Sequence, residues 1–300
     1  GTDGWTVNTI TLNSAAGATG GSALRLVNIS NDFTVTGNIN INSNGEAGIL
    51  IDGGDTDIRI GQVNSTNRLA VGIQVQDFNG TARFASANID NANAVAGNAI
   101  NIIDTYANGN SGVVEILGGL ITDAENDGVH IENSIATIRN VSVRVPNAAD
   151  AHDGIVVVTD GVNDAIVLID SNTVIDPDMM SIGDVGVRLL SNGTGTLFAT
   201  VSDNLLDSND NLDPNVDSIA SIHATVASGR ILMNAFENHD GDGTSPTNPI
   251  RLENLGGILD VTQTSASNLS SLNNNVDVQQ IGVINFGAGN PPEPPPIPSN

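Results

Sequence analysis

The segment 207–218 (DSNDNLDPNVDS) concentrates side-chain oxygens that suit a hard cation. Asp207, Asn209 and Asn211 occupy alternate positions, as in calcium loops of the D-x-[DN]-x-[DN]-G type. Asp213 adds a further carboxylate, although leucine and serine stand where such loops carry glycine and the closing glutamate. The spacing therefore predicts a calcium site at these residues, and a solvated acidic loop is the alternative.

A second group of carboxylates precedes glycine at two corresponding places in the chain. Asp127 precedes Gly128, Asp153 precedes Gly154, and His152 lies next to Asp153. If the two places are equivalent positions of neighbouring coils, the carboxylates lie close together. Paired carboxylates are the acid and base of glycoside hydrolysis, so these three side chains are candidate catalytic residues. The alternative is structural, because aspartate before glycine is common in turns.

The charge of the chain excludes several classes of partner. It has 34 acidic residues against 9 basic ones, a net charge of −25, and every basic residue is arginine. Nucleic acids and anionic membranes carry phosphate that would repel such a chain, so we expect neither as a partner. No apolar run approaches the roughly 18 residues that span a bilayer, so we expect no membrane insertion of this segment. Cysteine is absent, which excludes disulfides and thiolate chemistry.

Short alternating apolar stretches, separated by glycine and asparagine, predict β-strands along most of the chain. Their starts recur every 24 to 32 residues, and a second strand follows each start. A unit of two or three strands repeated about ten times predicts a solenoid, with one strand per coil in each sheet. We therefore expect an all-β fold, a right-handed parallel β-helix of about ten coils. The repeats begin at Ser22, Gly48, Gly72, Gly97, Gly128, Gly154, Gly186, Ser218, Pro249 and Asn275.

The ends of the chain differ from this body. We assign 1–20 as an N-terminal cap strand, 21–286 as the β-helix and 287–300 as a proline-rich C-terminal linker. Proline cannot donate to a strand ladder, so the last segment is predicted to be an extended polyproline II spacer. Helical patterns are nearly missing, and 176–182 is the one short helix that we expect.

Asparagine or aspartate recurs in or just after the second strand of several repeats. In a β-helix, side chains stacked in this way donate and accept hydrogen bonds between coils and satisfy buried turn amides. The recurrence therefore predicts a structural ladder, with a row of ligands as the alternative. The residues are Asn140, Asp170, Asp203 and Asn234.

These repeats resemble the pectin-lyase-like right-handed β-helix family, above all the β-helical regions of large bacterial surface exoproteins and autotransporter passengers. The resemblance covers residues 20–286 and implies a chain that is secreted or held at the bacterial cell surface. The resemblance predicts the architecture more than the activity, because lyases, hydrolases, phage tailspikes and non-catalytic adhesins all have this fold. The sequence signatures of polygalacturonases are missing, and the arginines are scattered where a lyase needs a basic group beside calcium ligands.

We therefore expect a non-catalytic structural or adhesive solenoid that contacts a host or glycan surface. One alternative is a filament subunit that self-associates through its two ends, because an uncapped β-helix exposes unpaired strand edges there. The other is a polysaccharide hydrolase or lyase that uses Asp127, Asp153 and His152. Calcium is the one cofactor that the sequence predicts.

Overall fold

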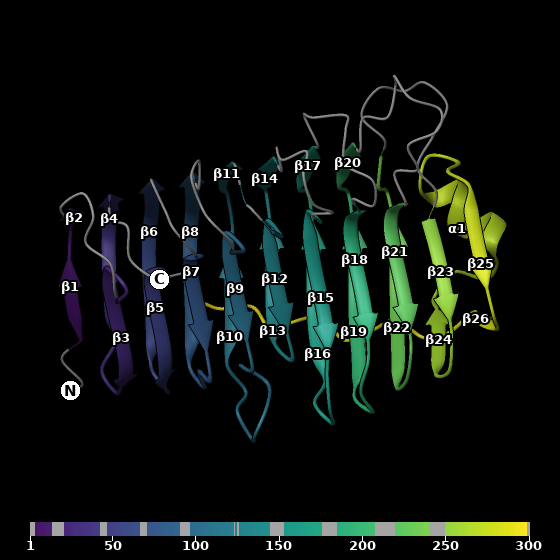
Figure 1. Cartoon of the computed structure of the whole chain (residues 1–300), viewed down its shortest axis with the longest axis horizontal. Helices are drawn as coiled ribbons and strands as arrows, with labels where there is room; N and C mark the ends of the chain where they lie inside the picture. Colours follow the sequence, from purple (N-terminus) through teal and green to yellow (C-terminus); the bar gives the residue numbers. More distant parts are fainter. Residues whose placement is uncertain are drawn as a thin grey trace.

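The computed structural model describes residues 4–13, 21–42, 47–66, 71–90, 97–122, 124, 126–144, 153–175, 185–207, 220–239 and 250–298. Strands of successive coils pair in parallel and stack along a rod (Figure 1). They form one sheet of ten strands and one of sixteen. The predicted all-β parallel β-helix is thus confirmed, and its coil number is close to the expected one.

The ten-stranded sheet contains one strand from each coil. Its terminal strands are β3 and β25, at opposite ends of the rod. In spatial order the strands are β3 (Leu24–Ile29), β5 (Ala47–Gly54), β7 (Val71–Gln76), β9 (Ile100–Ile103), β12 (Val129–Glu132), β15 (Ile155–Thr159), β18 (Val185–Ser191), β21 (Ala220–Val226), β23 (Ile250–Asn254) and β25 (Val278–Ile281).

The sixteen-stranded sheet begins with long strands and then divides. β1 (Trp5–Val7) and β2 (Ile10–Asn13) pair with β4 (Phe33–Asn42), which is followed by β6 (Asp57–Thr66) and β8 (Thr81–Asp90).

From β10 to β20 each coil has two separate strands where β4, β6 and β8 are each one long strand. The start of β8 pairs with β10 and its end pairs with β11, so the coils change from two strands to three. The β10 branch holds β10 (Val113–Ile116), β13 (Ile135–Arg139), β16 (Ala165–Asp170), β19 (Thr196–Ser202), β22 (Arg230–Phe236), β24 (Ile258–Val261) and β26 (Ile284–Phe286). The β11 branch holds β11 (Gly119–Thr122), β14 (Val141–Arg144), β17 (Thr173–Ile175) and β20 (Leu205–Asp207).

Aliphatic side chains stack in register along the interior of the rod. In β12, Val129 and Ile131 are buried, whereas the alternate residues His130 and Glu132 lie on the other face of the strand. Same-face neighbours on paired strands pack against each other, so a column of similar residues stabilises every coil through the next. One such column holds Leu24, Ile49, Ile73, Ile100, Val129, Ile155, Val187, Ile222, Ile250 and Val278.

Three of the predicted residues accept hydrogen bonds from a neighbouring coil: Asp170 from Oγ of Ser202 at 2.7 Å, Asp203 from Oγ of Ser171 at 3.2 Å and Asn234 from Nε2 of Gln263 at 2.9 Å. A separate, buried ladder of asparagines was not predicted. Nδ2 of each asparagine donates to Oδ1 of the next, at 3.0 Å, 2.9 Å and 2.8 Å. The predicted residue Asp203 takes the left-handed turn conformation, with φ of 52°, one position before this buried ladder. Turn and ladder positions are adjacent and both favour asparagine, so composition alone could not separate them. The ladder residues are Asn172, Asn204, Asn238 and Asn273.

A short helix in the last coil was not predicted. α1 (Ala266–Leu272) begins after Ser265, whose Oγ accepts the N–H of Asn268 at 3.1 Å, and its residue Leu269 is buried. The helix expected at 176–182 lies outside the described residues. In the part of the chain that the structure describes, no helix has the length and apolar character needed to cross a membrane.

The C-terminal tail turns back along the rod instead of extending from its end. In Figure 1 the yellow tail runs from β26 toward the N-terminal coils, where the C-terminus lies. The N–H groups of Gly287 and Ala288 donate to carbonyls of the last coils. At the far end, Nη1 of Arg59 donates to the carbonyl of Pro298 at 2.7 Å. The tail therefore packs on its own solenoid. The sequence predicted an extended spacer and did not predict this packing.

Candidate functional site

Asp127 and Asp153 lie at equivalent points of neighbouring coils, as the repeat predicts. They precede the paired strands β12 and β15, and the N–H of Gly128 donates to the Asp153 carbonyl at 3.1 Å. The glycine itself is a packing requirement, since a Cβ there would meet Cγ1 of Val143 at 2.3 Å. The Asp-Gly pairs therefore mark a place where two strands of a coil approach closely.

Both oxygens of the Asp153 carboxylate are bound within the chain. Oδ1 accepts the N–H of Val185 at 2.9 Å and Nη2 of Arg188 at 3.1 Å, and Oδ2 accepts Nε of Arg188. Burial raises the pKa of Asp153, and the Asp127 charge adds to this, while Arg188 opposes it. With only 8% of the residue exposed, this carboxylate is one side of a bidentate ion pair.

Asp127 and Glu132 flank one imidazole. Oδ2 of Asp127 lies 3.0 Å from Nδ1 of His130, and Oε2 of Glu132 lies 3.7 Å from Nε2. Burial lowers the pKa of His130, but the hydrogen bond to Asp127 and the two carboxylate charges outweigh it, so that the pKa lies above its ordinary value. Two carboxylates thus stabilise the imidazolium form of this histidine.

A second histidine lies between two arginines further along the same sheet. In the strand register His223 of β21 is opposite Arg188 of β18 and Arg251 of β23. Burial lowers the pKa of His223 and the Arg188 charge lowers it further, whereas Glu253, 3.3 Å from Nε2, acts in the opposite direction. Burial raises the pKa of Glu253, but the hydrogen bond from Arg251, at 2.6 Å, outweighs it and the pKa is lowered.

These side chains form a charged row on the outer face of the ten-stranded sheet, across β12 to β23. Acids and bases stand beside one another in it. The contacts of Asp153 with Arg188, of Arg188 with His223 and of His223 with Glu253 join one coil to the next. The other pairs lie within one coil and are Asp127–His130, His130–Glu132 and Arg251–Glu253. The sequence pointed to the aspartates but missed the bases that bind them. A partial signal existed, because Arg188 follows Gly186 at the same spacing as His130 follows Gly128. The row consists of Asp127, His130, Glu132, Asp153, Arg188, His223, Arg251 and Glu253.

The predicted calcium ligands are not tested by this structure. Asn209, Asn211 and Asp213 lie outside the described residues, as does His152. Of Asp207 the structure describes the backbone, which ends β20. Among the residues that are described, no group of three or more histidine, aspartate or glutamate side chains is arranged to hold a metal ion. Calcium binding stays a prediction from the sequence.

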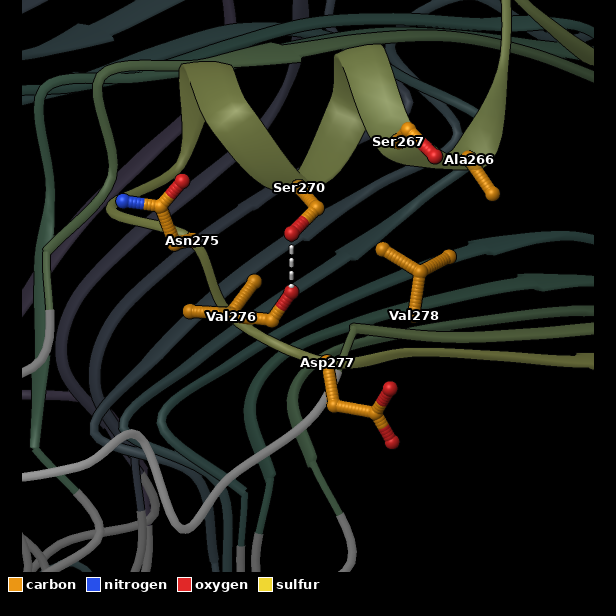
Figure 2. A pocket seen from close by; sticks show the side chains of 7 residues that line it. All are labelled: Ala266, Ser267, Ser270, Asn275, Val276, Asp277 and Val278. Atoms are coloured by element: carbon orange, nitrogen blue, oxygen red, sulfur yellow. Dashed lines mark hydrogen bonds between the residues drawn. The ribbon is translucent and has the colours of Figure 1, made fainter.

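The C-terminal end of the rod carries a cavity of about 580 Å³ between α1 and the segment that leads into β25. Figure 2 shows Ser270 of the helix facing Val276, and Ser270 Oγ donates to the Val276 carbonyl at 2.6 Å. The Asp277 side chain points away from the helix in the same view. Beyond this cavity β25 pairs with β23 alone, within the described residues.

The N-terminal end carries a cavity as well. It has a volume of about 460 Å³ and is lined by Trp5, by residues of β3 and by 30–33. Trp5 is 69% exposed. In the described part of the chain β3 pairs with β5 alone, so each end of the ten-stranded sheet has a strand with one partner.

Comparisons with protein-family models, with curated protein sequences and with solved structures give no match to this chain.

Proposed function

We propose that this chain is a non-catalytic structural or adhesive rod displayed at the bacterial cell surface. In this proposal it is related in role to the solenoid regions of pectin-lyase-like exoproteins and autotransporter passengers. The observation that carries it is the charged row. Asp153, the candidate acid or base, is bound on both oxygens by Arg188 and Val185, and Asp127 is bound by His130.

The physical basis of such a rod is repetition. Each coil buries an aliphatic stripe against the next, and the asparagine ladder satisfies buried turn groups from one coil to another. The interior therefore specifies the shape, while outward side chains are free to vary and to contact a host or glycan surface. The net charge of −25 favours solubility and repels anionic polymers.

A binding and cleavage assay on one panel of polysaccharides tests this proposal. The full chain is incubated with neutral and anionic polysaccharides, and both retention on the insoluble polymer and released reducing ends are measured. If the chain is a non-catalytic adhesive rod, it is retained on at least one insoluble polysaccharide and releases no reducing ends. Release that disappears in Asp127→Asn or Asp153→Asn would instead establish the hydrolase or lyase alternative.

A second candidate function, assembly into end-to-end filaments, is favoured by the two ends of the rod. β3 and β25 each have one partner in the described structure, and both ends expose apolar side chains such as Trp5 and Val283. Pairing the last strand of one rod with the first strand of the next is a heterologous contact, which builds an open filament. The high negative charge opposes this assembly, so added salt should promote it.

Sedimentation velocity and electron microscopy over a wide concentration range distinguish these functions. Filament assembly predicts larger species that increase with concentration and salt. Ile281→Lys, on the exposed edge strand β25, should then abolish them. Val162→Lys, on an exposed turn away from the ends, is the matched control and should not. A monomer at every concentration and salt would refute the filament and leave the single rod.

A further inference from the structure

The described part of the proline tail presents a regular face to the rod. Pro291, Pro294 and Ile297 are buried, whereas the residues between them are exposed. A spacing of three matches polyproline II, which has about three residues per turn and no internal hydrogen bonds. The tail therefore lies on the solenoid with one face of a polyproline II helix, as a peptide ligand lies in a groove.

Ile297 is the apolar anchor of this contact. It is 5% exposed and packs with Val113 and Ile135, and the partly buried Tyr106 and Ile166 border the same cluster. In the strand register, Val113, Ile135 and Ile166 lie side by side on the successive strands β10, β13 and β16. The anchor thus occupies an apolar patch on the outside of the solenoid, separate from its main core.

Charged side chains bind the tail backbone on either side of this anchor. The N–H of Ile297 donates to Oε1 of Glu115 at 3.0 Å, and Nη1 of Arg83 donates to the Ile297 carbonyl at 3.2 Å. Nη1 of Arg59 donates to the Pro298 carbonyl at 2.7 Å. Since 294–298 reads PPPIP, Ile297 carries the one backbone N–H of this stretch, and a buried carboxylate accepts it.

The arrangement of the two arginines also points to a ligand. Arg59 and Arg83 stand directly opposite each other on the paired strands β6 and β8, where like charges are destabilising. Each arginine also forms an ion pair, Arg59 with Asp57 and Arg83 with Glu115, both at 3.6 Å. The carbonyls of the tail are closer acceptors, so the bound peptide compensates for this juxtaposition.

We propose that Arg59, Arg83, Glu115, Val113 and Ile135 form a binding site for polyproline II peptides, which we name the proline groove. The peptide that it takes has the pattern Pro-x-x-Pro-x-x-Ile-Pro, and the resident ligand is the tail of the same chain. The tail is thus a latch that ties the last coil to the coils of β6, β8 and β10. This inference is independent of the proposed function, since it concerns neither the charged row nor the rod ends.

Displacement of the tail in the full chain tests the groove. Ile297→Asp removes the anchor and places a charge in the apolar patch, so it should release the tail and leave the groove empty. A fluorescent peptide AGNPPEPPPIP, residues 288–298, is then titrated by anisotropy into the Ile297→Asp chain and the wild-type chain. We expect saturable binding to Ile297→Asp at least about tenfold tighter than to wild type, where the tail competes at high effective concentration.

Two controls make the result specific. Pro295→Asp makes the same change in charge at an exposed tail position, so this chain should bind the peptide as weakly as wild type does. Adding Glu115→Val and Arg83→Ala to Ile297→Asp should weaken peptide binding by at least about tenfold, because both charge-assisted contacts are lost.

Three outcomes would overturn the groove. They are no saturable binding to a folded Ile297→Asp chain, equal binding to it and to wild type, and unchanged binding after the groove substitutions. Sedimentation of the wild-type chain separates the sources of the ligand. A monomer with a protected Ile297 amide in hydrogen exchange supports the latch within one molecule. Dimers that Ile297→Asp dissociates would mean that the tail of a second copy fills the groove, which contradicts the resident ligand proposed.

Discussion

Arg188 of β18 binds both oxygens of the carboxylate of Asp153, which lies two residues before β15 in the previous coil. The two residues are 35 positions apart in the sequence and meet because the coils stack in register. An aspartate that the sequence offers as an acid or base is therefore one half of a link between coils. A link of this kind stabilises a solenoid, whose coils contact only their neighbours.

The asparagine ladder should be sensitive to a single substitution. Asn204→Leu removes the donor to Ile169 and to Asn238 and leaves polar groups of Asn172 without their partner. Because buried polar groups without partners are costly, we expect a loss of about 2–4 kcal/mol in the free energy of unfolding. Urea denaturation measures it.

Asn192→Leu is the matched control, since Asn192 is exposed, and should change stability by less than about 0.5 kcal/mol. Equal losses in the two variants would mean that the ladder contributes nothing beyond its packing volume.

The pKa values of the two histidines in the charged row, His130 and His223, should be shifted in opposite directions. The pKa of His130 is raised, so its contribution to stability is present below the ordinary histidine pKa and is lost as pH rises through the folded value. The pKa of His223 is lowered, so its contribution is present above the ordinary value and is lost as pH falls through the folded value. His130→Gln should therefore destabilise more at pH 5 than at pH 8, and His223→Gln more at pH 8.

NMR titration of the imidazole protons checks this order directly. Each signal is assigned from the corresponding glutamine variant. A His130 pKa below that of His223 would show that the carboxylates beside His130 do not outweigh its burial.

Glycine after the two aspartates should be required for packing. A Cβ on Gly154 would meet Cγ1 of Val174 at 2.2 Å, so Gly154→Ala should cost about 1–3 kcal/mol by overpacking. The double variant with Val174→Ala should recover part of this loss, because the clashing methyl group is gone. Thermal melting measures both variants, and Gly289→Ala, which meets nothing within 4 Å, is the control. If Gly154→Ala melts at the same temperature as the wild type, the strands move apart at this position without loss of stability.

The sequence predicts the coils well because their cause is local and repeated. Gly128 and Gly154 immediately precede equivalent strands, and the alternation after each glycine shows which residues enter the core. The partners of Asp153 could not be predicted in this way, since the distance to Arg188 depends on the lengths of the intervening turns.

The position of the C-terminal tail could not be predicted from the sequence either. The prolines of 291–298 specify an extended conformation, but they do not specify the surface on which it lies. That surface combines Arg59, Glu115 and Ile135, which come from three different coils. Only the stacked structure brings them together, so the sequence could predict a spacer but not the latch.

A double-mutant cycle on Asp153 and Arg188 tests most directly whether the charged row is structural. Asp153→Asn, Arg188→Leu and the double variant are unfolded in urea, and the same chains are assayed for polysaccharide cleavage. If the pair is structural, each single variant loses about 1.5–3 kcal/mol, the double variant loses less than their sum, and no chain cleaves. Additive losses, together with cleavage by the wild type that Asp153→Asn abolishes, would contradict this and identify Asp153 as a catalytic residue.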